Sequence, residues 1–170
     1  MKYITIAEAQ RLTSPAPFGL VSAPKPDGGT NLAAVSWWTY LSNHPPMLGV
    51  CLSKKGYSGE LIRAGSEFAL NIVGEDLADA ALKCGRCSGR TENKAKAFKI
   101  PLEKAEKISA GIVSGSRAAF ECALVSSFDA GDHTMYIGEI VSVHGDENIK
   151  QLFACDGYAR LSTASERAEH

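Results

Sequence analysis

The stretch 31-NLAAVSWWTYLSNHPPMLGVCLSKKGYS-58 decides the predicted fold. Its two apolar runs, residues 31–38 and 47–52, are rich in residue types that favour β-strands. Pro45 and Pro46 lie between the runs and lack the N–H group that a strand ladder needs, so we expect a turn there. The second run ends in a small, cationic, hydroxyl-rich loop, residues 53–58, whose donors suit an anion such as a phosphate. An ordinary surface loop is the equally supported alternative.

Strand and helix patterns continue on both sides of this stretch. We expect strands at residues 18–23, 31–42, 47–52, 67–73, 117–128 and 133–145, and a short strand in a closing segment, residues 148–161. We expect helices at residues 6–12, 57–64 and 75–85, and one helical turn near 92–97, with Gly65 and Gly85 as stop signals. The segments 27–29 and 129–132 predict two hairpin turns, so that residues 18–42 form one hairpin. Six or seven strands in hairpins favour a mainly β fold with short helices, an antiparallel barrel that is closed or nearly so, over a parallel α/β sheet.

The composition is that of an ordinary globular domain. With 170 residues, 45% hydrophobic and 22% charged, we expect one domain over residues 1–161 and a polar C-terminal tail over 162–170. The net charge of −1 argues against nucleic acid and anionic membranes as partners. No apolar run approaches the ~20 residues of a membrane span, and the N-terminus does not read as a signal peptide. An odd number of cysteines, five, does not indicate a secreted disulfide framework, so the cytoplasm is the expected location.

The spacing Cys84-Gly-Arg-Cys87 raises the question of a metal or redox site. Structural zinc normally takes four ligands, and the sequence has no second pair of this kind. A redox dithiol usually opens a helix, whereas this pair follows a predicted helix. We therefore expect two ordinary thiols in a loop and no metal.

Three further features carry candidate chemistry. In residues 88–94, Ser88 and Gly89 allow close backbone approach and Arg90 can bind a phosphate with two parallel hydrogen bonds; Lys94 joins it if residues 91–97 are helical. His133 ends a Gly-Asp-His turn at the expected barrel rim. For residues 88–94 and for His133, an exposed polar turn without a ligand is the alternative. Trp37 and Trp38 are adjacent, so on a strand one of them faces outward, which is typical of an interface.

Taken in chain order, these stretches resemble the flavin reductase-like family, whose fold is the FMN-binding split barrel. Residues 15–72 resemble its N-terminal half in order and spacing. The stretch 84-CGRCSGRTENK-94 is similar to the family's CGxxSGRxxDK, and residues 117–147 carry a Glu-Cys strand, the Gly-Asp-His turn and a Gly-Glu strand in the family's order. The resemblance covers residues 15–145 and is closest to the flavoredoxin-like branch.

The resemblance implies a set of site residues. FMN is expected along Asn31, Leu32, Ala33, Ala34 and Ser36, with its ring near Cys51, Leu52 and Ser53 and its phosphate at Tyr57 and Ser58, with charge from Lys54 or Lys55. Ser88, Gly89, Arg90 and Lys94 are expected close to the cofactor, and His133, as the catalytic candidate, near the open face of the ring. Two positions depart from the family: Asn93 replaces an Asp, with an apparent insertion before Phe98 that makes Lys96 an alternative to Lys94, and Ala34 replaces a Pro.

The function that the resemblance implies is an NAD(P)H-dependent flavin (FMN) reductase, an oxidoreductase that passes hydride or electrons through FMN to flavin or another acceptor. The family is usually dimeric, so we expect a homodimer. The alternative is a flavoredoxin-like electron carrier with tightly bound FMN and no efficient nicotinamide site, and a redox protein as partner stays open. A third hypothesis, a barrel that binds nucleic acid as an OB-fold does, is disfavoured by the near-zero charge. The sequence also lacks GxGxxG, GxxxxGK[ST], HExxH and GxSxG motifs.

Overall fold

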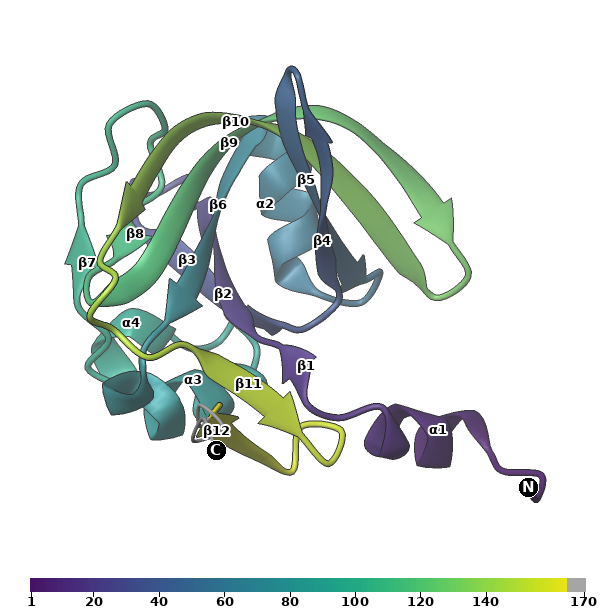
Figure 1. Ribbon diagram of the computed structural model, residues 1–170. Helices are drawn as coiled ribbons and strands as arrows, with labels where there is room; N and C mark the ends of the chain where they lie inside the picture. Colours follow the sequence, from purple (N-terminus) through teal and green to yellow (C-terminus); the bar gives the residue numbers. More distant parts are fainter. Residues whose placement is uncertain (165–170) are drawn as a thin grey trace.

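The computed structural model describes residues 1–164, and most of its regular structure is antiparallel β (Figure 1). Seven strands form the main sheet in the spatial order β3-β2-β6-β9-β10-β5-β4. Their bounds are β2 Gly19–Pro24, β3 Thr30–Val35, β4 Trp38–Asn43, β5 Pro46–Ser53, β6 Glu67–Val73, β9 Ser116–Ala130 and β10 His133–Gly145. The sheet curls but does not close, because β3 and β4 remain its two edges. The predicted antiparallel split barrel is confirmed.

The split results from an interruption of strand structure at Ser36 and Trp37, which is called the break below. The sequence predicted one strand over residues 31–42, and this prediction is wrong. β3 pairs with β2, with Val35 opposite Gly19, whereas β4 pairs with β5, with Trp38 opposite Val50. Nothing in the local sequence marks the break, since every residue from 31 to 42 tolerates a strand and neither Gly nor Pro interrupts them. The two halves of the predicted strand therefore lie at opposite edges of one sheet.

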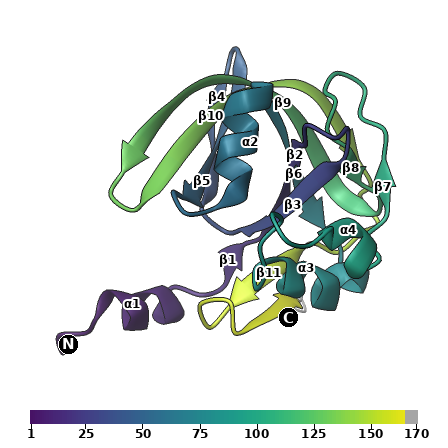
Figure 2. The ribbon, with the colours of Figure 1, turned by 180° about the vertical axis from the view of Figure 1, so that it is seen from behind.

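Helix α2, Tyr57–Gly65, lies within the curl of the sheet (Figure 2). Its buried residues Leu61 and Ile62 join the core that the sheet's inward-facing residues form. The helix ends one residue later than predicted: Gly65 is its last residue, and Ser66 takes the left-handed conformation with φ 56°. A Cβ on Gly65 would lie 2.6 Å from Cγ of Pro24, so glycine is needed there for close packing on β2 rather than as a stop signal.

Smaller elements cover the lower end of the barrel. The predicted helix 75–85 is confirmed as a 3₁₀ turn, η1 Glu75–Leu77, followed by α3 Ala78–Cys84, and α4 spans only Lys94–Ala97. Five short strands complete the fold: β1 Ala16–Pro17, β7 Leu102–Glu103, β8 Ile112–Val113, β11 Leu152–Cys155 and β12 Arg160–Thr163. Of these, β1, β11 and β12 form a separate three-stranded sheet. The strands β7 and β8 were not predicted, because each has only two residues.

The two ends of the described chain differ in how they pack. Helix α1, Ile6–Leu12, forms as predicted, closed by a capping box between Thr5 and Glu8, but it buries no residue and projects from the body (Figures 1 and 2). At the other end, Ser162 and Thr163 belong to β12, so the last strand enters the predicted tail; residues 165–170 lie outside the described part. No helix within residues 1–164 is long and apolar enough to cross a membrane.

One buried carboxylate joins the β9–β10 hairpin to the loop after β7. Glu121 on β9 is fully buried and accepts hydrogen bonds from the backbone N–H groups of Glu106 (2.8 Å) and Lys107 (2.6 Å). Nε2 of His144 on β10 lies 2.6 Å from the same carboxylate. Burial alone raises the pKa of Glu121, but these donors outweigh it, so the pKa lies below its ordinary value. The ionised form of Glu121 therefore stabilises the fold.

We expect Glu121→Gln to lower the free energy of unfolding by about 2 kcal/mol at neutral pH, because charged acceptors make the stronger hydrogen bonds. Since the folded pKa is lowered, the contribution of Glu121 is fully present above its ordinary pKa of 4.5 and is lost as the pH falls through the folded value. Urea unfolding of both proteins between neutral and acidic pH measures this. The exposed Glu147→Gln serves as the control. A difference between wild type and Glu121→Gln that stays constant below pH 4.5 would contradict the assignment.

Candidate functional site

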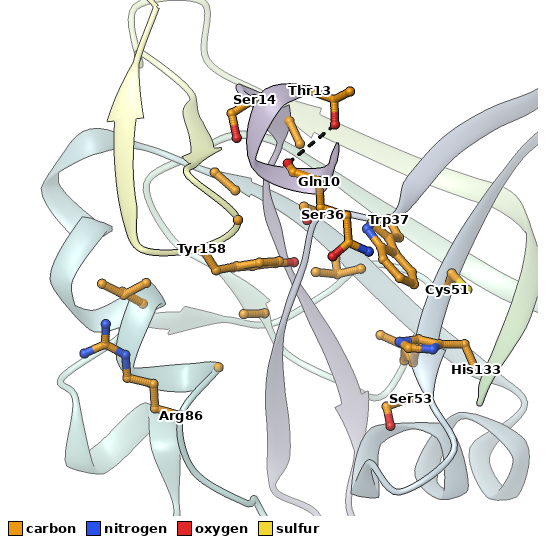
Figure 3. A pocket seen from close by; sticks show the side chains of 18 residues that line it. Gln10, Thr13, Ser14, Ser36, Trp37, Cys51, Ser53, Arg86, His133 and Tyr158 are labelled. Atoms are coloured by element: carbon orange, nitrogen blue, oxygen red, sulfur yellow. Dashed lines mark hydrogen bonds between the residues drawn. The ribbon is translucent and has the colours of Figure 1, made fainter. Parts of the chain in front are cut away.

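A cavity of about 500 Å³ opens at the split of the barrel, within the size range of small-ligand pockets (Figure 3). Its barrel wall comes from the end of β3, the break, the end of β5 and the start of β10. Six residues of the predicted site line this wall: Ala34, Ser36, Cys51, Leu52, Ser53 and His133. The cavity exists because β3 and β4 diverge at this point, which leaves the rim between them open.

Strand register fixes which of these residues lie opposite one another. β5 and β10 are paired so that Ser53 lies opposite His133 and Cys51 opposite Met135. The N–H of Cys51 donates to the carbonyl oxygen of Trp37 at 2.8 Å, which ties the break to β5. The Trp37 ring packs against the His133 ring with centroids 4.7 Å apart. These contacts hold an indole and an imidazole together at one side of the cavity.

The His133 imidazole is also held by its neighbour in the hairpin turn. Nδ1 of His133 lies 2.7 Å from Oδ1 of Asp132, and this hydrogen bond lowers the pKa of the Asp132 carboxyl. The ring is thus fixed from two sides, by a carboxylate and by an indole. The ring held in this way lines the cavity.

A second group of predicted residues gathers at the start of α2. Nδ2 of Asn31 on β3 donates to Oγ of Ser58 at 2.8 Å, and both side chains are buried. A Cβ on Gly89 would lie 1.7 Å from Oδ1 of Asn31, so the 88–90 turn lies directly on that amide. The Arg90 guanidinium stacks on the Tyr57 ring, 4.7 Å from its centroid, and pairs with Glu60. Three segments far apart in the sequence meet here.

The first turn of α2 has free hydrogen-bonding capacity. Its N-cap is Gly56, which has no side chain to accept from the first-turn N–H groups. Unsatisfied N–H groups and the positive end of the helix dipole attract an anion, and Ser58 and Arg90 add a hydroxyl and a cation nearby. The N–H of Gly56 donates to the carbonyl oxygen of Ser53 at 2.9 Å, which joins this turn to the cavity wall. The donor set fits a phosphate attached to a flat ligand in the cavity.

Four predicted residues have other surroundings. Leu32 is fully buried in the core, and Ala33 lies between it and the wall residue Ala34 on β3. Nζ of Lys54 lies 3.0 Å from Oδ2 of Asp129, which directs it to the β9–β10 turn. Lys94 is buried, its Nζ donates to the carbonyl oxygen of Cys84 at 2.8 Å, and burial lowers its pKa.

The helical spacing that would align Lys94 with Arg90 does not exist, because α4 begins at Lys94. Ser88 lies in the turn itself, where its Oγ accepts from the N–H of Arg90 at 3.2 Å. The expectation of two loop thiols is also corrected: Cys84 is the last residue of α3 and is buried, which raises its pKa to about 11, and only Cys87 is in the loop. All five cysteines are free thiols, and no group of three metal-ligating side chains occurs within residues 1–164.

Sequence reasoning missed the wall opposite the barrel strands. This wall includes the polar residues Gln10, Thr13, Ser14, Arg86 and Tyr158. They come from the end of α1, the residues after α3 and the β11–β12 turn, which neither share a pattern nor lie near one another in the chain. Only the tertiary structure brings them together.

Comparison with known proteins places the chain in a family. Residues 11–162 match the model of the flavin reductase like domain. The chain belongs to this family. Among relatives, a flavin reductase of Pseudomonas putida is 27% identical over 81% of this chain and 78% of its own length. The structure of a flavoredoxin of Desulfovibrio vulgaris (Miyazaki F) superposes with a TM-score of 0.86 at 24% identity, covering 100% of this chain and 97% of that one.

Other relatives are longer than the region they share with this chain. An uncharacterized protein of Archaeoglobus fulgidus is 32% identical over 68% of this chain, and the match spans 66% of that protein. In a relative from Aeropyrum pernix the match, again 32% identical, spans 44% of the protein and 68% of this chain. The chain therefore spans only part of the length of these two relatives.

We expect Gly89→Ala to destabilise the protein by about 1–3 kcal/mol, the usual cost of overpacking, because the added methyl group must displace the Asn31 amide from Ser58. Gly85→Ala is a matched control in the same segment, since its Cβ would meet Cβ of Ala34 at 3.3 Å. Urea unfolding of the three proteins measures the difference. Equal midpoints for both variants would show that the 88–90 turn does not depend on this contact.

Proposed function

We propose that the protein binds FMN and acts as an NAD(P)H-dependent flavin reductase, passing hydride from the nicotinamide through FMN to free flavin or another acceptor. One observation carries the proposal: the uncapped start of α2, with Ser58 and Arg90 beside it, adjoins a cavity of about 500 Å³. A phosphate and a flat ring joined by a short chain match these two neighbouring features. Membership of the flavin reductase-like family supports the same ligand.

The phosphate is held by the residues at the start of α2. Backbone N–H groups of the first turn and the Ser58 hydroxyl donate to it, and the Arg90 guanidinium neutralises its charge. Tyr57 and Glu60 keep Arg90 in place, one by stacking and the other by its ion pair. Lys54 and Lys94 make no contact with the phosphate in this proposal, because Lys54 is directed to Asp129 in the β9–β10 turn and Lys94 is buried against the Cys84 carbonyl oxygen.

The ring is placed against the barrel wall. The small side chains of Ala34, Ser36 and Ser53 leave room for a flat system, and Leu52 and Cys51 supply apolar contact. His133, fixed by Asp132 and Trp37, borders the side on which a second molecule approaches the ring. FMN, when bound, supplies the hydride chemistry, and the protein supplies position and surroundings.

The test of this function is an absorbance spectrum of the purified protein, loaded with FMN if needed, before and after anaerobic addition of NADH or NADPH. Flavin bands that bleach promptly with either nucleotide are the expected result. Bands that persist with both nucleotides would instead favour an electron carrier that another protein reduces. No flavin in the preparation and none bound on titration would reject both.

Removing the phosphate donors isolates their role. We expect the double variant Ser58→Ala/Arg90→Ala to bind FMN at least about fivefold more weakly than wild type, as the loss of charge-assisted hydrogen bonds predicts. Fluorescence titration of FMN measures the dissociation constant. Lys83→Ala, which removes an exposed cation of α3 outside the cavity lining, is the control. Unchanged affinity in the double variant would mean that the phosphate binds elsewhere.

We further propose that two copies associate through the outer face of β4, β5, β10 and β9. Cys51, Met135 and Phe128 are directly opposite one another across three strands, so their side chains share this face. Leu41 extends the strip, because the site of a Cβ on Gly49 would be within 3.0 Å of both Leu41 and Met135. Leu41 is 46% and Phe128 55% exposed, and the strip reaches the cavity at Cys51. Contiguous apolar surface of this kind marks an interface.

The association makes a prediction about size in solution. We expect wild type to sediment as a dimer and Leu41→Asp/Phe128→Asp to sediment as a monomer with an unchanged circular dichroism spectrum. Glu92→Asp/Lys104→Arg, two conservative changes at exposed residues, is the control. A monomeric wild type would reject the interface.

The five free thiols suit a reducing compartment, so we propose the cytoplasm as the location of the protein.

A further inference from the structure

The cavity has a second end, away from the proposed ring position. There Arg86 and Tyr158 line the cavity, with Arg86 at its rim and Gln10 and Thr13 from the end of α1 above them. Figure 3 shows Tyr158 between Arg86 on one side and the Trp37–His133 pair on the other. The flavin assignment uses none of the four residues at this second end.

The position of Tyr158 comes from a strained turn. Asp156, Gly157 and Tyr158, between β11 and β12, have φ angles of 52°, 61° and 74°, in the left-handed region that is unfavourable for a residue other than glycine. The Tyr158 ring packs edge-on against Phe18 with centroids 6.0 Å apart. Burial raises the pKa of Tyr158, and hydrogen bonds with Ser36 of the barrel wall act in the opposite direction. Strain of this kind is concentrated at ligand sites.

The charge at this end is unbalanced. Among the described residues that line the cavity, Arg86 is the single Lys or Arg, and none is Asp or Glu. Within residues 1–164 the Arg86 guanidinium makes no ion pair, whereas the neighbouring Arg90 is paired with Glu60. A guanidinium with free donors at the rim of an otherwise neutral cavity favours an anionic ligand group.

We propose that Arg86 binds a negatively charged group of the small molecule that shares the cavity with the flavin ring, and that the Tyr158 ring packs against the body of that molecule. The inference rests on the proposed function, which places the ring against the opposite wall. A flat aromatic or quinonoid body packs on the Tyr158 ring, and its anionic substituent meets Arg86. The anion is carried by the electron acceptor or by the phosphates of the nicotinamide nucleotide.

The phosphate of FMN is a different anion at a different place. Its proposed site is the start of α2, and Tyr57, Ser58 and Arg90 are not among the residues that line the cavity. Arg86 follows α3, and its backbone N–H donates to the carbonyl oxygen of Lys83. The two cationic positions can therefore be tested separately.

The test compares two unreactive ligands of the same ring system, naphthalene-2-sulfonate and the uncharged 2-naphthol, by isothermal titration calorimetry with and without saturating FMN. We expect Arg86→Gln to bind the sulfonate at least about fivefold more weakly than wild type and 2-naphthol within twofold of wild type. Arg86→Lys should fall between, because it keeps the charge and loses the planar fork. Lys83→Gln removes a cation three residues away and should change neither constant. Tyr158→Phe, which keeps the ring and removes only the hydroxyl near Ser36, should change neither constant.

Three results would overturn the role of Arg86. Equal losses of affinity for both ligands in Arg86→Gln would overturn the proposal, since Arg86 would then affect the shape of the cavity and not bind the anion. A loss of FMN affinity with unchanged sulfonate binding would overturn it too, because Arg86 would then hold the flavin phosphate. A wild type that binds no sulfonate likewise overturns it. If the protein binds no FMN, the proposed function fails, while the titrations without FMN still decide whether Arg86 forms an anion site.

Steady-state kinetics then identify which molecule carries the anion. If Arg86→Gln raises KM for 1,4-naphthoquinone-2-sulfonate but not for 1,4-naphthoquinone, the acceptor carries it. If it raises KM for NADH or NADPH with both quinones, the nucleotide carries it. Equal KM values for every substrate in wild type and Arg86→Gln would overturn the subsite.

Discussion

The hydrogen bond from the Cys51 N–H to the Trp37 carbonyl oxygen marks the constraint on which the site depends. It lies where the chain leaves β3 at one edge of the sheet and enters β4 at the other. A sheet that curls this far and remains open must expose a rim between its edges. In this protein the rim is lined by the break, the end of β5 and the start of β10, so the cavity is a direct consequence of incomplete closure.

The helix inside the curl gives the open barrel a core and the site its anion-binding end. α2 packs so closely that a Cβ on Gly59 would lie 2.2 Å from Oη of Tyr136, and one on Gly65 would meet Pro24. Close packing fixes the direction of the helix, and with it the direction of its first-turn N–H groups. The glycine at the N-cap then leaves those groups without an internal acceptor. The close packing along α2 and the hydrogen-bond donors at its start are therefore linked.

The outer wall of the cavity is built from elements outside the seven-stranded sheet. α1 buries no residue, whereas Tyr158, in the turn before β12, packs on the buried Phe18. These elements come from segments that the main sheet does not include. We infer that the barrel wall determines which cofactor binds, whereas α1, Arg86 and the Tyr158 turn determine which second molecule is accepted.

The sequence by itself determined most of the strands and helices, because periodicity and turn residues are local signals: β6 and α1 match their predicted bounds. Its order of motifs also indicated the family and the residues of the barrel wall. Only the tertiary structure decided that residues 31–42 divide between two edges, since strand propensity carries no information about the partner strand. It also decided that Lys94 is buried against Cys84 while Arg90 reaches Tyr57, because the start of α4 depends on packing. Arg86 and Tyr158 share no local pattern, and their places on the same wall of the cavity follow from long-range contacts alone.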